Sequence, residues 1–152
     1  MLNKSIEEAL IQVSNILNEK KIPWMLIGSC NLAIQGMDLD PRDIDLCVNK
    51  KDFDKLEKIF SKFWKVVVSK FPSKFKGEAY KLTFFVDGVE IEFLGETSQN
   101  LYTTHLNSRG FIRKDFKGAV LNLNKLENEY KSYFNMERID KANKIKEYLM
   151  PL

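Results

Sequence analysis

Apolar residues near the start of the chain recur at helical spacing. Between residues 5 and about 20 they fall three and four positions apart, at Ile6, Ala9, Leu10, Val13, Ile16 and Leu17. This period predicts an amphipathic helix. Ser5 followed by Glu8 has the spacing of a capping box, which would fix the first turn.

The pattern then changes to that of strands. Residues 24–27 form a short apolar run between Pro23 and Gly28, which predicts a buried strand. Ser29 is placed to cap a short helix that would end near Gly36. Beyond a polar loop, apolar residues alternate with polar ones in a second strand, Ile44, Leu46 and Val48 against Asp43, Asp45 and Cys47.

The remaining segments alternate between the same two patterns. We expect a second helix opened by Asn49 and Asp52, a β-rich segment at 64–68, a hairpin of 82–86 and 89–94 around Asp87-Gly88, and two helices at about 122–134 and 137–149. The sequence therefore predicts an α/β (α+β) fold, a mixed sheet flanked by helices with two helices at its C-terminal end.

The chain has 152 residues, which predicts a single domain spanning 1–152. Hydrophobic residues make up 44% and charged residues 30%, a globular composition. The net charge of +3 is too small to indicate nucleic-acid binding by itself. Cys30 and Cys47 are expected to be free thiols, and no apolar run is long enough for a membrane span, so we expect a cytoplasmic protein.

The candidate chemistry begins with two aspartates. Asp43 and Asp45 are two positions apart in a predicted strand, so their carboxylates project from the same face. Paired like charges of this kind favour a bound cation between them. Oxygen ligands suit Mg²⁺, which is usually completed by substrate phosphates. The pair therefore predicts a metal site for a phosphate-bearing substrate.

Two further segments extend this candidate site. The Gly28-Ser29 turn leads into a helix N-terminus, where free N–H groups favour phosphate oxygens. The later strand offers a third carboxylate, and we prefer Glu92, which lies deeper in the strand than Glu90, over that alternative. Phosphate-binding groups and metal ligands would then be neighbours.

These motifs resemble a known family. Leu26-Ile27-Gly28-Ser29, a short helix to Gly36 and then Pro41-Arg42-Asp43-Ile44-Asp45-Leu46 are similar to the nucleotidyltransferase superfamily, which includes polymerase-β-like enzymes. The similarity is strongest over residues 24–48 and weaker over 82–94. In the C-terminal segment, Arg138, Asp140 and Lys141 resemble a helix motif of many small members.

The resemblance implies transfer of a nucleoside monophosphate from a nucleoside triphosphate to a hydroxyl acceptor, with two Mg²⁺ ions. By motif, Asp43 and Asp45 would be metal ligands, and Glu92 would bind the catalytic metal and help to deprotonate the acceptor. Gly28 and Ser29 would hold the β- and γ-phosphates, with Arg42 neutralising charge nearby. The acceptor, which could be a small molecule, an RNA end or a protein, stays open, and a second copy or a partner protein could complete its pocket.

Other interpretations remain open at this stage. Many members have Asp where this chain has Glu92, and Asp38 and Asp40 add negative charge to the nearby loop, which leaves room for an inactive nucleotide sensor or interaction module. The lysines between Lys62 and Lys81 are interleaved with aromatic residues, as in an RNA-binding surface or a solvated loop. His105, the only histidine, could serve as a base, but its polar surroundings favour a position in a surface loop.

Overall fold

The computed structural model describes residues 2–61, 67–73, 77–95 and 101–150. The helices are α1 (Lys4–Glu19), α2 (Gly28–Ile34), α3 (Phe53–Phe60), α4 (Tyr102–Asn107), α5 (Leu126–Asn135) and α6 (Ile139–Leu149), with a 3₁₀ helix η1 at Lys50–Asp52. The strands are β1 (Trp24–Ile27), β2 (Ile44–Val48), β3 (Val67–Ser73), β4 (Gly77–Val86), β5 (Val89–Gly95), β6 (Phe111–Phe116) and β7 (Ala119–Asn124). None of the helices in these ranges is long and apolar enough to cross a membrane.

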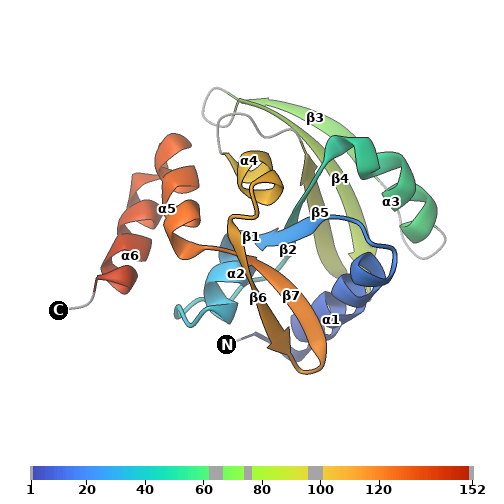
Figure 1. The fold of residues 1–152 in the computed structure, drawn as a ribbon, viewed down its shortest axis with the longest axis horizontal. Helices are drawn as coiled ribbons and strands as arrows, with labels where there is room; N and C mark the ends of the chain where they lie inside the picture. Colours follow the sequence, from blue (N-terminus) through green and yellow to red (C-terminus); the bar gives the residue numbers. More distant parts are fainter. Residues whose placement is uncertain (1, 62–66, 74–76, 96–100, 151–152) are drawn as a thin grey trace.

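The strands form one mixed sheet of seven strands in the order β3-β4-β5-β2-β1-β7-β6. β2 and β5 run parallel to each other, as do β1 and β7, whereas the other neighbouring strands are antiparallel. Figure 1 shows α5 and α6 side by side at one end of the molecule, far from α3. The predicted α/β class, a mixed sheet flanked by helices, is confirmed.

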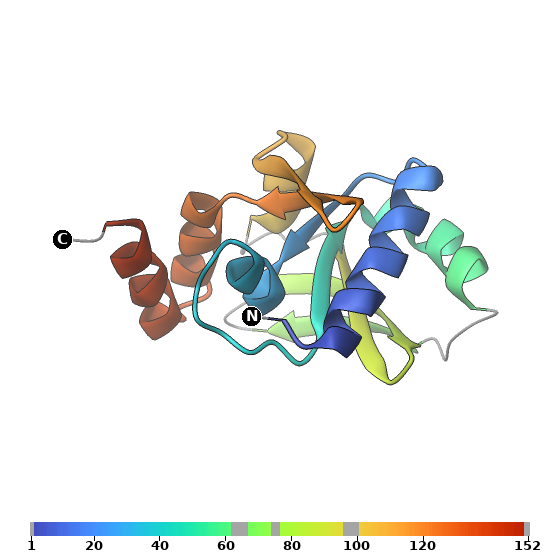
Figure 2. The ribbon, with the colours of Figure 1, turned by 90° about the horizontal axis from the view of Figure 1, so that it is seen from below.

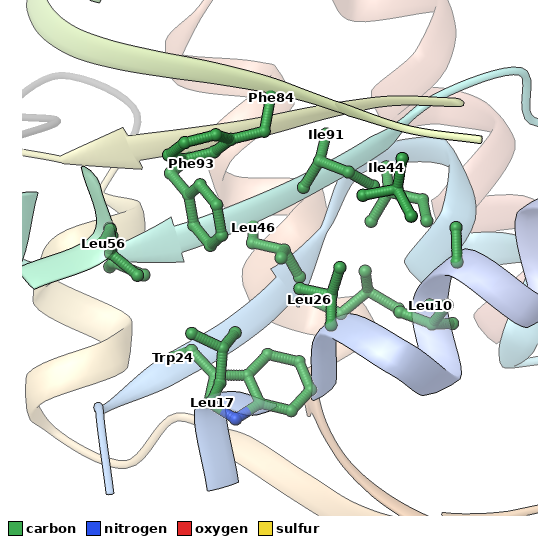
Figure 3. Close-up of a cluster of buried hydrophobic side chains, with 14 of the residues drawn as sticks. Leu10, Leu17, Trp24, Leu26, Ile44, Leu46, Leu56, Phe84, Ile91 and Phe93 are labelled. Atoms are coloured by element: carbon green, nitrogen blue, oxygen red, sulfur yellow. The ribbon is translucent and has the colours of Figure 1, made fainter. Parts of the chain in front are cut away.

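Helices cover both faces of the sheet. α1 and α3 bury their apolar sides against one face, where Leu10 and Leu17 point toward the strand residues Leu26 and Leu46 (Figure 3). The rings of Phe60, Phe84 and Phe93 pack within 5.2–5.7 Å of one another in the same cluster. On the other face, α2, α4, α5 and α6 pack over Met25, Ile27 and Cys47. Seen from below, the C-terminal helices project on the side opposite α1 and α3 (Figure 2).

The first helix forms as its period predicts, but its cap differs. The side-chain oxygen of Asn3 accepts a hydrogen bond from the backbone N–H of Ile6, so Asn3 caps α1. The predicted capping box of Ser5 and Glu8 is therefore wrong. The helix begins one residue earlier, at Lys4, because the Asn3 side chain already satisfies a free N–H group of the first turn.

The central strands follow the prediction closely. β1 spans the apolar run, and β4 and β5 form a hairpin whose Asp87 and Gly88 have φ angles of 49° and 81°. Two consecutive positive φ angles are typical of the tight turn that the Asp-Gly pair predicts. Cys30 and Cys47 are buried free thiols, and burial raises the pKa of each to about 12.

The segment after residue 101 differs most from the prediction. Residues 111–124 form the hairpin of β6 and β7, which the sequence pattern did not reveal, and α5 begins only at Leu126 rather than at about 122. Leu121 and Leu123 are buried against the sheet core as strand residues. An isolated apolar spacing cannot tell a strand end from a helix start, and pairing with β1 decides in favour of the strand.

His105 was expected in a surface loop, and that expectation is wrong. It lies in α4, and only 9% of its surface is exposed. Burial, followed by the nearby charge of Lys131, lowers the pKa of His105, which keeps the ring neutral near pH 7. This residue therefore belongs to the packing of α4 rather than to a solvated surface.

Candidate functional site

Strand register brings the predicted carboxylates together. Asp45 lies opposite Ile27 in the antiparallel pair of β1 and β2, and opposite Glu92 in the parallel pair of β2 and β5. Residues opposite each other in a sheet project from the same face. Asp43 precedes β2 by one residue and interacts electrostatically with Glu92 and Asp45. We call these three residues, Asp43, Asp45 and Glu92, the carboxylate cluster.

Gly28 lies so close to this cluster that a side chain there would press against a carboxylate. Its φ angle is +73°, and an added Cβ atom would lie 3.0 Å from Oδ2 of Asp45. Both the backbone conformation and the contact favour glycine. The strand-to-helix turn therefore places its backbone directly against the carboxylate.

Asp45 carries the strongest electrostatic strain in the cluster. Burial, then the charges of Glu92 and Asp43, raise the pKa of Asp45 well above its usual value. Its Oδ1 atom is enclosed and has no hydrogen-bond partner. Burial and the Glu92 charge likewise raise the pKa of Asp43. An unpartnered buried carboxylate oxygen is costly unless a cation satisfies it.

Lys81 of β4 supplies a positive charge beside the cluster. Its ammonium forms an ion pair with Glu92, and both side chains are largely enclosed. Burial alone would raise the pKa of Glu92, but hydrogen bonds from Lys81 and Asp45 outweigh it and lower that pKa. Lys81 ends the lysine-rich stretch that could form an RNA-binding surface, but its contact here is with a candidate metal ligand. Residues 62–66 and 74–76 of that stretch lie outside the described residues.

The hydroxyl of Ser29 does not cap α2, contrary to expectation, because α2 has no side-chain cap. Instead, Nζ of Lys141 in α6 donates a hydrogen bond of 2.8 Å to Oγ of Ser29. The ammonium also lies 5.0 Å from the ring centroid of Tyr133. Burial, then the charge of Arg138, lowers the pKa of Lys141. The Ser29 hydroxyl and the Lys141 ammonium thus lie together at the turn between β1 and α2.

Beneath the turn lies a buried carboxylate that the sequence pattern did not predict. Glu129 of α5 has no exposed surface. Its Oε2 accepts hydrogen bonds from the Gly28 N–H at 2.8 Å and from Asn31 at 3.0 Å. Its Oε1 accepts one from Asn124 at 3.1 Å, and Tyr102 also bonds to it. Because the Gly28 N–H points at Glu129, that group is directed into the protein rather than toward a ligand.

The pKa of Glu129 reflects two opposed effects. Burial raises it to about 7, although the hydrogen bonds from Asn31, Asn124, Tyr102 and Gly28 act in the opposite direction. One signal in the sequence could have pointed to this residue. Glu129 follows Leu126 by three positions and precedes Tyr133 by four, so an acid occupies the buried stripe of a helix.

Other charged residues that the sequence pointed to lie outside the carboxylate cluster. The side chain of Arg42 is exposed, and it forms no ion pair within the described ranges. Glu90, the alternative third carboxylate, is hydrogen-bonded to Glu92. Along β5 it is two residues from Glu92, the residue opposite Asp45, and it lies opposite Phe85 of β4. Asp38 and Asp40 are both exposed. Solvent therefore screens the charges of these two aspartates.

Comparison with known proteins bears on the fold. No protein-family model and no curated protein matches the chain. The crystal structure of a protein described as a "putative nucleotidyltransferase" from Thermotoga maritima superposes with a TM-score of 0.75, over 98% of this chain and 95% of that one, at 24% identity. The chain has a nucleotidyltransferase-like fold. In this nucleotidyltransferase-like domain, the turn after β1 and the acidic strand β2 are neighbours through the register described above.

The chemistry of the cluster suits a hard divalent cation. Three carboxylates, one of them with an enclosed and unpartnered oxygen, are the ligands that Mg²⁺ prefers. Within the described ranges, no three His, Cys, Asp or Glu residues are arranged closely enough to hold a metal ion. The hydrogen bond between Asp45 and Glu92 and the Lys81 ion pair compensate the charge instead. A bound cation would therefore offset the negative charge in place of the proton between Asp45 and Glu92 and of the Lys81 ammonium.

Proposed function

We propose that this protein is a Mg²⁺-dependent nucleotidyltransferase that moves a nucleoside monophosphate from a nucleoside triphosphate to a hydroxyl acceptor. One observation carries the proposal. The unpartnered Oδ1 of Asp45 lies within a carboxylate cluster that directly abuts the Gly28 turn. The nucleotidyltransferase-like fold supports the same interpretation, although a fold by itself does not fix a function.

The residues divide into two groups by charge. Asp43, Asp45 and Glu92 would hold Mg²⁺, which when bound neutralises phosphate charge and stabilises the charge that develops on the attacking and leaving oxygens. Ser29 and Lys141 would bind the β- and γ-phosphates, since a hydroxyl and an ammonium are suitable donors to phosphate oxygens. α2 has only seven residues, so the side chains rather than the helix dipole would carry this binding.

The reaction would be an in-line displacement. The acceptor hydroxyl attacks the α-phosphorus, a new oxygen–phosphorus bond forms, and pyrophosphate leaves with the electron pair of the broken bond. A carboxylate oxygen of Glu92 would take the proton of the hydroxyl. Lys141 would stay on the side of the leaving pyrophosphate, where its positive charge offsets the charge that builds up.

The Lys141→Met substitution tests the phosphate assignment. Loss of one charge-assisted hydrogen bond to phosphate is expected to weaken Mg-ATP binding by about tenfold or more. Isothermal titration calorimetry would measure the affinity. Lys144→Met, an exposed lysine one turn along the same helix, is the matched control and should bind as the wild type does. Equal affinities of all three proteins would remove Lys141 from the site.

Two measurements test the function as a whole. Titration of ATP, GTP, CTP and UTP with and without Mg²⁺ should reveal metal-dependent binding of at least one triphosphate. Release of labelled pyrophosphate in the presence of candidate acceptors would then establish transfer. Binding without turnover would indicate a nucleotide sensor, an alternative favoured by the long Glu92 side chain being held by Lys81. Failure of every triphosphate to bind would show that the carboxylate cluster, Ser29 and Lys141 do not form a nucleotide site.

A further inference from the structure

A pocket of about 410 Å³ opens at the end of β1 that is remote from the carboxylate cluster. It lies between the C-terminal ends of α1 and α4 and the edge strand β6. Its apolar lining includes Leu17, Trp24 and Leu106, all of which are almost fully buried. The proposed function uses none of these residues.

Three cations from three different elements line this pocket. Lys21 follows α1, Arg109 follows α4, and Arg113 lies in β6. No aspartate or glutamate is part of the lining, and these three side chains form no ion pair within the described ranges. The pocket therefore has an excess of positive charge that nothing in its walls offsets.

Two of the cations occupy equivalent positions in helix-ending turns. Lys21 and Arg109 both have a φ angle of 57°. The N–H of the next residue reaches back five positions in each case, from Ile22 to Leu17 and from Gly110 to His105, at 3.0 and 2.7 Å. Glycine is the usual residue at such a position, since a side chain there is strained. The two turns direct a lysine and an arginine to one pocket at positions where glycine would be easier to accommodate.

The uncharged polar groups of the pocket already have partners. The amide of Asn122 donates to the carbonyl of Trp24 at 3.0 Å, and Asn18 bonds both to the indole N–H of Trp24 and to the carbonyl of Val120. Asn107 donates to Asn49 at 2.9 Å. These contacts hold the wall in place, and Lys21, Arg109 and Arg113 are the charged donors that can serve a ligand.

We propose that this pocket binds a small molecule bearing a phosphate group, at a site separate from the carboxylate cluster. Guanidinium groups match phosphate oxygens in pairs, and an ammonium adds a third point of charge. The volume lies in the range of small-molecule sites. A concave pocket with an apolar floor suits a compact ligand better than an extended nucleic-acid backbone, which tracks along a groove.

The two sites differ in what they can hold. They lie at opposite ends of β1, with Trp24 at the pocket and Ile27 at the turn, and the strand between these two residues is about 10 Å long. Asp43, Asp45 and Glu92 repel an anion unless Mg²⁺ accompanies it, whereas the basic pocket needs no metal. Binding there should therefore persist when Mg²⁺ is removed by chelation.

The test titrates AMP and ribose 5-phosphate into the full chain in the presence of a chelator. Binding is followed by calorimetry and by the NMR signal of the Trp24 indole N–H, which is assigned with a Trp64→Phe variant. The double variant Arg109→Ala/Arg113→Ala should lose affinity by at least about tenfold. Lys20→Ala, an exposed lysine beside Lys21 that does not line the pocket, is the control, and Lys141→Met should also bind normally.

The opposite outcomes are equally clear. Loss of binding in Lys141→Met with retention in the double arginine variant would place the ligand at the turn and overturn the proposal. No response to either probe at millimolar concentration would do the same. Tight, strongly salt-dependent binding of a short RNA, irrespective of a terminal phosphate, would show a nucleic-acid surface instead. Because the triphosphate titrations concern other residues, failure here leaves the proposed transferase site untouched.

Discussion

Asp45→Asn is expected to make the protein more heat-stable while it abolishes Mg²⁺-dependent binding of nucleoside triphosphates. The ionised carboxylate is disfavoured in the fold, as its raised pKa and its unpartnered oxygen indicate. A neutral amide of the same shape removes the repulsion from Glu92 and Asp43. A gain of about 1 kcal/mol, or roughly 2–4 °C in melting temperature, should follow.

The loss of binding has the same physical origin. The repulsion that destabilises the metal-free fold is what a divalent cation relieves, so removing it should also remove the main attraction for Mg²⁺. Differential scanning fluorimetry and calorimetric titration would measure the two effects on one sample. Asp40→Asn, an exposed aspartate in the preceding loop, is the matched control and should change neither. Undiminished Mg-ATP affinity in Asp45→Asn would rule this residue out as a metal ligand.

Glu129→Ala should cause the largest loss of stability of any substitution considered. The change leaves the Gly28 N–H and the side chains of Asn31, Asn124 and Tyr102 without their shared acceptor, and it opens a cavity. Unsatisfied buried donors cost about 1–3 kcal/mol each before relaxation, so a total of about 3–5 kcal/mol is expected. Denaturant unfolding at pH 7 would measure it. Glu127→Ala, an exposed glutamate of the same helix, should stay within about 0.5 kcal/mol of the wild type.

Glu129→Gln separates the charge of this residue from its shape. The Asn124 Oδ1 atom has no partner. A half-turn of the Asn124 amide would place this oxygen where it can accept a hydrogen bond from the introduced glutamine amide, and the Tyr102 hydroxyl can also act as an acceptor. The cost of this substitution should therefore be well below that of Glu129→Ala. Nearly equal losses in the two variants would show that the packing volume, not the hydrogen bonds, matters at this position.

Comparison of the wild type with Glu129→Gln also tests the pH dependence. Because the folded-state pKa of Glu129 is raised from 4.5 to about 7, the folded protein holds a proton there that the unfolded chain has lost. Stability should increase as the pH falls from about 7 toward 4.5, by up to roughly 3 kcal/mol from this group, and that gain is lost as the pH rises through 7. Glu129→Gln should lack this component. Identical pH profiles for the two proteins would contradict it.

Local pattern was sufficient for the elements whose pairing partners lie close in the chain. The helical period of residues 4–19 and the Asp87-Gly88 turn each carry their own physical cause, an apolar face and two positive φ angles. In contrast, β6 is an edge strand with four exposed residues in its middle, so it shows no alternation that could reveal it. It exists because β7 pairs with it along its whole length.

By itself, the sequence determined the sheet-and-helix class, the strand that carries Asp45, and the short turn at Gly28, since each follows from residues only a few positions apart. The tertiary structure alone decided which charges surround that turn. Gly28 and Glu129 are 101 positions apart, and Ser29 and Lys141 are 112 apart. Contacts over such separations arise only when α5 and α6 pack against the sheet, because no local periodicity records which buried groups will meet.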